Sequence, residues 1–423
     1  MSRSRAGATL DAPDDTSRDV AVGERVDDVD HLDQEHISKR RLRRRQRRRQ
    51  WRALLLAVVL VAALSVGGPA LRRHLSDEST PAKRATAPAQ PAVVKQPPAK
   101  TTLVVHVGPD GRADLAMVTG TDRHGTTPTL LLMPTGSQVQ TPSLGLQTIA
   151  DLPRLGDAAL TTTTVENLLG IGIGKTIVLN DLSLLAAATP AGSLPVTFAQ
   201  PIHVQDGAGV FAYPAGQQQL APTDVARLVG RLETSDELGH LKNLQTVFAS
   251  WFAALHDAGV RDRTAAAVPG FDRVVDVVRA DPKVLTLPVQ AAATGGGSEL
   301  FRVDRAELSD IMTTNFADAL LAGGNRPRVQ LLNGTGAVGL AQEIAGCIVP
   351  AGFRVSLTDN VRGFGVKTSA VIAQEAADLP AARRLAKLLH IGPARRASKA
   401  SGLVDVAVVV GADFHGCTPA SGG

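Results

Sequence analysis

The stretch ALLLAVVLVAALSVGGPAL, from Ala53 to Leu71, contains no charged side chain. Its length is about that needed for a helix to cross the hydrocarbon core of a bilayer. A single segment can satisfy its backbone polar groups in lipid only as a helix. We therefore expect residues 53–71 to form one transmembrane helix that divides the chain between two compartments.

The charges flanking this stretch predict its orientation. Ten Lys and Arg residues lie between Lys39 and Arg52, whereas only Arg72 and Arg73 follow the stretch closely. Positive charge beside a first span tends to remain in the cytoplasm. We expect a single-pass cell-membrane protein with a cytoplasmic N-terminus and with everything after about residue 72 outside. The alternative is a cleaved signal peptide, but a lead of about 50 residues is longer than the usual n-region.

Residues 1–52 are predicted to be a disordered cytoplasmic tail, because they are polar and lack apolar periodicity. They carry 14 Lys and Arg against 10 Asp and Glu, so most of the chain's net charge of +5 lies there. Such an arginine run favours contact with anionic membrane lipids. Nucleic acid is the alternative partner, and we do not expect it. Residues 72–100 are rich in Pro and Ala and predict an extended linker.

The remaining residues are numerous enough for two domains with cores of their own, at 101–325 and 326–415, with a short tail at 416–423. The chain has two cysteines, Cys347 and Cys417, both on the predicted outer side, where disulfides persist. They either pair with each other or are buried singly. A zinc site needs more ligands than these two, and we expect no resident metal.

The first domain is predicted to be mixed α/β, because β-branched or Leu-rich runs alternate with segments of helical periodicity. The expected strands are 103–107, 130–133 and 176–179. The expected helices are 224–232, 241–255 and 304–321, with a loop at 295–297.

The second domain shows the order β-α-β-β-α-β in about 90 residues. This order is typical of the split βαβ, or ferredoxin-like, arrangement. The expected elements are strand 329–332, helix 338–348, strands 353–357 and 368–373, helix 381–389 and strand 404–410.

Two glycine-rich motifs resemble nucleotide-binding loops. Residues 170–176 end in Gly-Lys-Thr, but Leu169 occupies the position where a phosphate loop needs its first glycine, and strand-like residues follow. Residues 334–339 fit G-x-G-x-x-G between a strand and a helix, with Asp359 about 20 residues further on. The alternative for the second motif, which we favour, is a tight strand-to-helix turn that needs small residues.

The second domain resembles the LytR C-terminal domain. The resemblance rests on four segments in order over about 90 residues: Val329 to Ala341, Ala351 to Val355, Thr368 to Ile372 and Val408 to Phe414. In that family the domain follows a membrane anchor and a LytR-CpsA-Psr catalytic domain, which matches the organisation predicted above.

Residues 101–325 are similar to the LytR-CpsA-Psr domain more faintly, in a degenerate form. Asp110, Arg112 and Asp114 stand in a compressed version of the family's first Asp and Arg motif, and Arg231 corresponds to the second arginine of an R-x-R pair whose first is Val229. The strand ending in P-R-D-T in the family reads Pro134-Thr-Gly-Ser here. Gly239 and Lys242 stand at or near two further arginine positions.

The resemblance implies a protein that binds a polyprenyl pyrophosphate-linked glycan and, with magnesium, transfers it to peptidoglycan. Arginines suit this chemistry because their planar fork meets phosphate oxygens and neutralises developing charge. With several arginines missing, Asp110, Arg112, Asp114 and Arg231 are candidates for a vestigial catalytic site only. Magnesium is expected only if transferase activity is retained, and no other cofactor is expected. Motifs of serine and zinc hydrolases are absent from the sequence.

Three functions therefore remain open. The leading one is a non-catalytic envelope protein that binds a wall glycan, a lipid-linked precursor or a partner protein, and the runner-up is an active glycopolymer phosphotransferase. The third is an anchor whose cytoplasmic tail carries a signal. A transferase predicts cations converging around Asp110 and Asp114 on an apolar pocket. A binding protein predicts a pocket without that cluster, and an anchor predicts no pocket.

Overall fold

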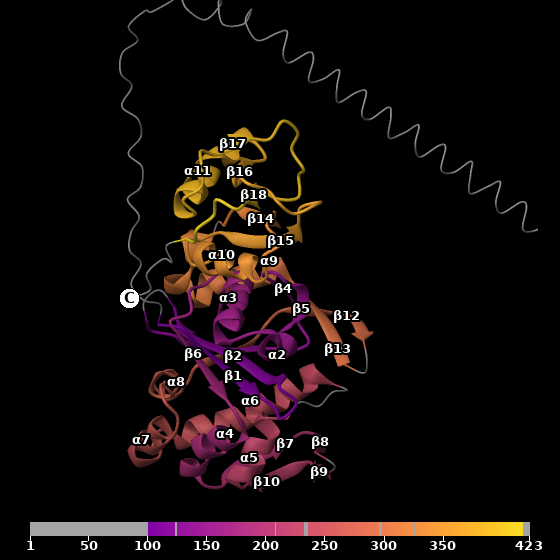
Figure 1. Cartoon of the computed structure of the whole chain (residues 1–423). Coiled ribbons are helices and arrows are strands. Elements are labelled where there is room, and N and C mark those ends of the chain that lie inside the picture. The colour runs from indigo at the N-terminus through magenta and orange to yellow at the C-terminus, as the bar shows by residue number, and fades with distance from the viewer. Residues whose placement is uncertain are drawn as a thin grey trace, which may run out of the picture. The chain divides into compact units, whose positions relative to one another are not determined.

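The chain is described by a computed structural model that covers residues 100–122, 125–207, 209–231, 236–295, 298–324 and 326–417 (Figure 1). The predicted transmembrane helix at 53–71, the tail before it and nearly all of the linker lie outside these ranges. Within them, no helix combines the length and apolar character needed to cross a membrane.

The first domain is built on a five-stranded sheet with the strand order β11-β3-β2-β1-β6. Antiparallel pairs join β1 to β2 and β2 to β3, whereas β6 runs parallel to β1 and β11 runs parallel to β3. The strands are β1 (Thr102–Val107), β2 (Ala113–Thr121), β3 (Pro128–Met133), β6 (Lys175–Leu179) and β11 (Lys283–Thr286). Strands β1, β3 and β6 confirm the predicted runs.

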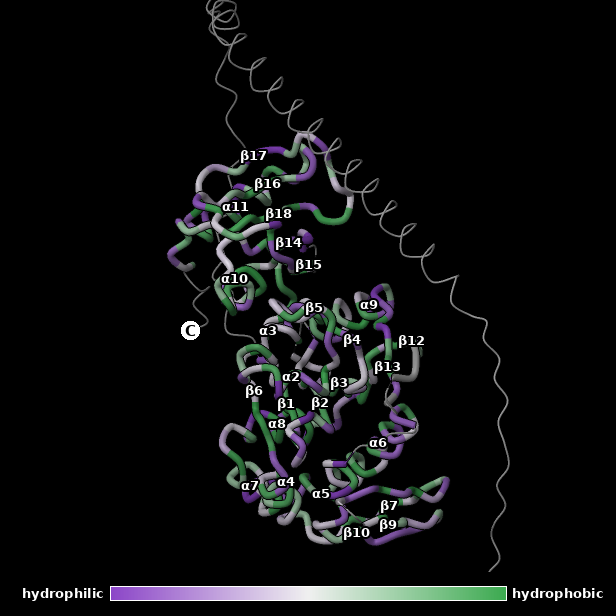
Figure 2. The backbone as a smooth tube through the Cα atoms, turned by 45° about the vertical axis from the view of Figure 1, so that its right-hand side comes forward, coloured by the Kyte–Doolittle hydropathy of each residue, from purple (hydrophilic) through white to green (hydrophobic). Residues whose placement is uncertain are grey.

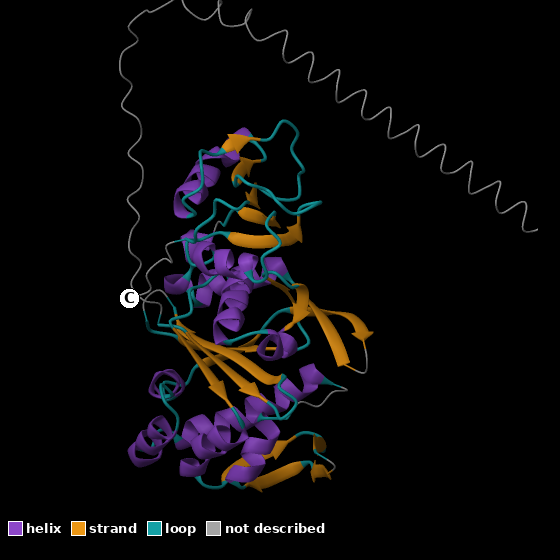
Figure 3. Ribbon diagram, viewed as in Figure 1, coloured by secondary structure: helices purple, strands orange, loops and turns teal. Residues whose placement is uncertain are grey.

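Helices cover both faces of this sheet, which explains why its central strands are almost continuously apolar (Figure 3). Side chains alternate between the faces: Val104 packs in a core with α4, α5, α6 and α8, and its neighbours Leu103 and Val105 pack in a core with α3 and α9. The helices are α3 (Ala158–Leu169), α4 (Asp181–Ala188), α5 (Pro222–Val229), α6 (Glu237–Ala254), α8 (Asp272–Val278) and α9 (Arg305–Asn315). Figure 2 shows the apolar character of the strands between these layers.

Smaller elements extend the domain at its margins. The predicted helix at 304–321 ends earlier, at Asn315, and two 3-10 helices, η4 (Ala317–Ala319) and η5 (Leu321–Gly324), follow. The predicted loop at 295–297 lies at the tip of the β12–β13 hairpin, with residues 296–297 outside the described ranges. The remaining elements are β4 (Gln138–Thr141), β5 (Gly145–Thr148), η2 (Ile149–Asp151), α2 (Leu152–Leu155), η3 (Thr189–Ala191), β7 (Leu194–Phe198), β8 (Ile202–Asp206), β9 (Gly209–Tyr213), β10 (Gly216–Leu220), α7 (Ala258–Ala267), β12 (Val289–Gly295) and β13 (Ser298–Val303).

The second domain contains the six predicted elements in the predicted order, with a further two-residue strand, β17, between α11 and β18, but the split βαβ arrangement is wrong. Its sheet has the order β15-β14-β18-β16-β17, so β15 pairs directly and in parallel with β14, and no strand lies between the two. Strand β15 is therefore an outer strand, and β18 takes the other side of β14. The elements are β14 (Arg328–Asn333), α10 (Leu340–Ile348), β15 (Arg354–Asn360), β16 (Ala370–Ala373), η6 (Ala376–Asp378), α11 (Leu379–Leu388), β17 (Arg395–Arg396) and β18 (Val406–Val410).

A disulfide joins Cys347 on α10 to Cys417, with 6.4 Å between the Cα atoms and a sequence separation of 70. The bridge ties the end of the described chain to the helix that packs on β14. Of the two alternatives that the sequence left open, a disulfide or two singly buried cysteines, the structure has the disulfide.

Two side chains connect α3 to the second domain. The Asn167 amide donates to the Val355 carbonyl at 2.8 Å and accepts from the Val355 amide at 2.9 Å. Arg326 donates to the carbonyls of Glu166 and Asn167 at the end of the same helix. Asn167 thus adds two hydrogen bonds to β15, an outer strand of its sheet.

Candidate functional site

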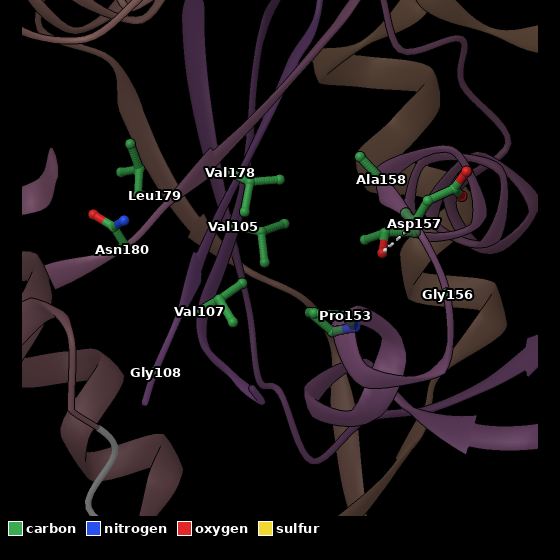
Figure 4. Close-up of a pocket in the computed structure, with 11 residues that line it drawn as sticks. Val105, Val107, Gly108, Pro153, Gly156, Asp157, Ala158, Val178, Leu179 and Asn180 are labelled. Atoms are coloured by element: carbon green, nitrogen blue, oxygen red, sulfur yellow. Dashed lines mark hydrogen bonds between the residues drawn. The ribbon is translucent and has the colours of Figure 1, made fainter. Parts of the chain in front are cut away.

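A pocket of about 390 Å³ lies where β1 and β6 end side by side. Figure 4 shows Val105, Val107 and Val178 on the strands, facing Pro153 and Ala158 across the opening. Because the strands are parallel, their carboxyl ends and the loops that follow meet at one edge of the sheet, a common position for ligand sites. The lining residues are Val105, Val107, Gly108, Pro153, Gly156, Asp157, Ala158, Thr161, Val178, Leu179 and Asn180.

The pocket is largely aliphatic, and no Lys or Arg lines it. Val178 is 53% exposed, since β6 is an outer strand of the sheet and the pocket lies beside it. Asp157 is the N-cap of α3, and its carboxylate accepts from the Leu160 amide at 2.9 Å. An aliphatic wall with few polar groups suits the apolar part of a ligand.

The candidate residues Asp110 and Arg112 lie in the tight turn between β1 and β2. The Gly111 amide donates to the Gly108 carbonyl, the Gly108 amide donates to the Arg112 carbonyl, and Gly111 has a φ of +77° that favours glycine. The exposed carboxylate of Asp110 accepts from the Arg112 amide at 3.0 Å. The sequence motif therefore has a clear structural purpose, which is to close a hairpin.

Asp114 points into a polar cluster with His106 and Asp181. The His106 ring lies with Nε2 at 3.1 Å from Asp181 Oδ1 and Nδ1 at 3.7 Å from Asp114 Oδ2. Burial and, after it, repulsion from Asp110 raise the pKa of Asp114 to about 7, against the attraction of Arg231. Burial also lowers the pKa of His106. Near neutral pH Asp114 is thus partly protonated, and His106 carries little positive charge.

Arg231 is held by carboxylates on two sides. Its Nη1 and Nη2 donate to the two oxygens of Asp181 at 2.8 and 2.6 Å, and its Nε donates to Asp206 at 3.0 Å. These hydrogen bonds raise the pKa of the Arg231 guanidinium. Asp206 also pairs with Arg227 at 3.2 Å, and Arg227 lies 3.7 Å from the centre of the Phe211 ring. The guanidinium groups of Arg227 and Arg231 already donate to these carboxylates, so neither is free to bind a phosphate.

The pocket and the Arg231 cluster lie on opposite sides of β1. Val105 and Val107 line the pocket, whereas the intervening His106 faces Asp181 and Arg231. Side chains of a strand alternate in this way. Gly108 connects the two regions, because it lines the pocket and a Cβ placed on it would lie 2.4 Å from Asp114 Oδ2.

A second pair of cations lies near the β1–β2 turn. Arg112 Nε is 3.6 Å and Arg154 Nη2 is 3.9 Å from one oxygen of Asp151. The two side chains are 34% and 52% exposed. Arg154 follows Pro153, which lines the pocket. Two arginines that share one carboxylate at these distances retain donors for another anion.

At the other positions where the family has arginine or aspartate, this chain has Thr135, Gly136, Gly239 and the exposed Lys242. Thr135 and Gly136, which follow the third strand, donate to the buried carboxylate of Glu237. Burial raises the pKa of Glu237. Gly239 donates to Asp236 in the N-cap of α6, and Lys242 is exposed. A carboxylate is thus buried against the loop where the family has arginine and aspartate.

The two glycine motifs form other local structures in the described chain. Gly170 ends α3, and Lys175 already belongs to β6. In the second motif the Asn333 side chain accepts from the amides of Thr335 and Gly336. The amides that would receive a phosphate are therefore already satisfied, which agrees with the turn that the sequence analysis favoured.

Several residues of the site escaped the sequence analysis, because their partners are far away in the chain. His106 and Asp181 are 75 residues apart, and Asp206 lies 25 residues before Arg231. The one signal available was the position of Asp181, directly after a strand that could lie parallel to β1.

Within the described ranges, no group of three His, Cys, Asp or Glu side chains is arranged to hold a metal ion.

Residues 326–414 match the family described as LytR cell envelope-related transcriptional attenuator. The match confirms the LytR C-terminal domain predicted from the sequence and implies a cell-envelope protein. No curated protein matches the chain.

Solved structures similar to the chain include LytR-CpsA-Psr proteins, the family that the first domain resembles in sequence. TagV of Bacillus subtilis is 15% identical, with a TM-score of 0.43 over 50% of this chain and 93% of that one. A LytR-Csp2A-Psr enzyme of Actinomyces oris is 14% identical, with a TM-score of 0.40 over 50% and 88%. The family protein YwtF (TagT), with octaprenyl pyrophosphate lipid bound, is 14% identical, with a TM-score of 0.37 over 50% and 86%.

Proposed function

We propose that this chain is a membrane-anchored cell-envelope protein that binds a lipid-linked glycan precursor without transferring it. The apolar chain of the precursor would enter the pocket between β1, β6 and α3. The observation that carries the proposal is the aliphatic wall at the edge of the sheet, in which Val178 is 53% exposed, Val107 is half-buried and Val105 is buried. Valine side chains that line a concave, open site favour burial of an apolar ligand.

The phosphates of such a ligand would meet Arg112 and Arg154 near the pocket. These are the arginines of the site with donors to spare, since Asp151 is their shared partner and lies at 3.6 and 3.9 Å from them. Arginine forks often form two parallel hydrogen bonds to phosphate, so the half-buried Arg112 and the exposed Arg154 suit a pyrophosphate. Wall glycan and an envelope protein are the further partners expected from the sequence resemblance.

The absence of transfer is proposed from the state of Arg231. Phosphoryl transfer needs cations aimed at the charge that develops on the phosphates. Here the Arg231 fork is closed by Asp181 and Asp206, and it lies across β1 from the pocket. Its charge is therefore neutralised before any substrate arrives.

One observation favours the alternative, a glycopolymer phosphotransferase. Asp114 has a pKa raised to about 7 and lies against Gly108, which lines the pocket. A carboxyl group with a raised pKa beside a pocket is typical of catalytic sites. An active enzyme would lose turnover on Asp114→Asn while retaining ligand binding.

The proposal is tested by titrating the full-length protein with geranylgeranyl pyrophosphate. Val178→Asp places a charge on the pocket wall that a bound chain would have to desolvate, so we expect binding to weaken at least about tenfold, or 1.4 kcal/mol. The matched control is Val210→Asp on β9, because Val210 is 64% exposed and does not line the pocket. Equal binding by both variants would contradict the proposal.

A further inference from the structure

The second domain carries an unbalanced cationic surface. Residues 379–404 contain no Asp or Glu. All six of their Lys and Arg residues are exposed. These residues are Arg383, Arg384, Lys387, Arg395, Arg396 and Lys399. We call Arg383 and Lys387 of α11, together with Arg396 on the side of the sheet that carries α11, the basic face.

The fold brings these residues together through a βαβ unit. Strand β16 leads into α11, and β17 then returns parallel to β16 with Ile372 opposite Arg395 and Ala373 opposite Arg396. Residues opposite each other share a face of the sheet. Because Ala373 is buried in the core with Leu385 and Ala386 of α11, Arg396 lies on the side of the sheet that carries α11. Figure 1 shows α11 and β17 as neighbours.

None of the six side chains forms an ion pair with another described residue, although Arg328 of the same domain pairs with Asp405 at 2.7 Å. Arg384 lies over the Phe353 ring at 4.6 Å. Arg383 and Lys387 are four residues apart on one helix, where like charges repel and destabilise it. The domain therefore keeps an uncompensated charge that costs stability.

Protection of a sheet edge accounts for only part of this charge. Cations on an outer strand such as β17 prevent pairing with another chain, and Arg395 and Arg396 suit that role. The α11 residues do not belong to an edge, and an exposed helix surface ordinarily mixes both signs. The cations of α11 thus indicate an anionic partner.

We propose that the basic face binds a soluble phosphodiester polymer of the cell envelope. Arginine forks meet phosphate oxygens bidentately, and cations spread over a helix and a strand suit an extended chain of repeated charges. A lipid bilayer fits less well, because no large apolar side chain between residues 379 and 400 is exposed for insertion. The nearest in sequence is Leu403. This inference does not depend on the pocket of the first domain.

The test uses the full-length protein and fluorescent poly(glycerol phosphate), with neutral dextran for comparison. The variant Arg383→Gln, Lys387→Gln, Arg396→Gln leaves Arg384 on the Phe353 ring. The matched control removes three exposed cations of the first domain: Lys242→Gln, Arg263→Gln, Arg273→Gln. The N-terminal arginines are the same in both proteins, so their contribution cancels. Urea unfolding establishes that both variants are folded.

We expect the basic-face variant to bind poly(glycerol phosphate) at least about tenfold more weakly than the control variant. We also expect the salt dependence, the slope of log affinity against log salt, to fall by about 2, at about 0.7 for each phosphate that the variant no longer neutralises. Equal affinities of the two variants would overturn the proposal. So would binding to phosphatidylglycerol vesicles that depends on the basic face while poly(glycerol phosphate) does not bind, since the partner would then be a membrane.

Discussion

Replacement of Arg231 by leucine tests whether this arginine is a structural ion-pair partner. The change removes three charge-assisted hydrogen bonds: two to Asp181, at 2.8 and 2.6 Å, and one to Asp206, at 3.0 Å. Each such bond contributes about 1.5–3 kcal/mol when well shielded. The Asp181 and Asp206 side chains are 47% and 32% exposed, so water recovers much of this energy. We expect a loss of about 2–4 kcal/mol in the free energy of unfolding.

Urea unfolding of the full-length protein at neutral pH measures this loss, with fluorescence of the buried Trp251 as a probe of the first domain. Arg279→Leu is the matched control, because Arg279 pairs with Asp276 at 3.2 Å on the surface and should contribute about 1 kcal/mol or less. Adding Asp181→Asn to Arg231→Leu should restore about 1 kcal/mol, since it removes a carboxylate that has lost its arginine and retains only His106 as a partner. Equal costs for Arg231→Leu and Arg279→Leu would refute the structural role.

Three further changes test other parts of the structure. Burial lowers the pKa of His240 to about 4, against a weaker opposing effect of the Leu228 carbonyl. The unfolded chain therefore binds more protons at this position between about pH 6.5 and 4, so the contribution of His240 to stability should fall by up to about 3 kcal/mol as the pH drops through this window. His240→Leu should flatten that dependence in urea titrations at a series of pH values. Asn167→Ala leaves the buried amide and carbonyl of Val355 unpaired and should cost about 2–4 kcal/mol, measured as earlier urea unfolding of the second domain. Cys417→Ser opens a loop of 70 residues and should lower stability by up to about 4 kcal/mol, and dithiothreitol should affect the parent protein but not the variant.

Much of the fold could be predicted from local patterns. The runs at 103–107 and 130–133 are apolar without alternation, because they are buried on both faces, and they form β1 and β3. The order of strands in the second domain could not be predicted. The sequence shows that a helix joins β14 to β15, but it does not show whether a third strand enters between them. Here β14 pairs with both β15 and β18, which excludes the split arrangement.

In the candidate site too, local features could be predicted from the sequence and contacts between distant segments could not. Asp110, Arg112 and Asp114 could be predicted to lie together, because they belong to one hairpin. The environment of Arg231 could not be predicted, because it depends on Asp181 and Asp206 from two other elements. An arginine that matches a family position is a phosphate ligand only if its partners leave its fork free. The sequence shows the arginine but does not show its partners.

Titration of the full-length protein with geranylgeranyl pyrophosphate, in magnesium and then in EDTA, tests the central claim most directly. The proposed role, binding in an aliphatic pocket without transfer, predicts saturable binding with dissociation constants that agree within about threefold, or 0.7 kcal/mol, in the two conditions. It also predicts binding at least about tenfold weaker in Val178→Asp. Binding that requires magnesium and is unaffected by Val178→Asp would contradict it and would favour a phosphotransferase.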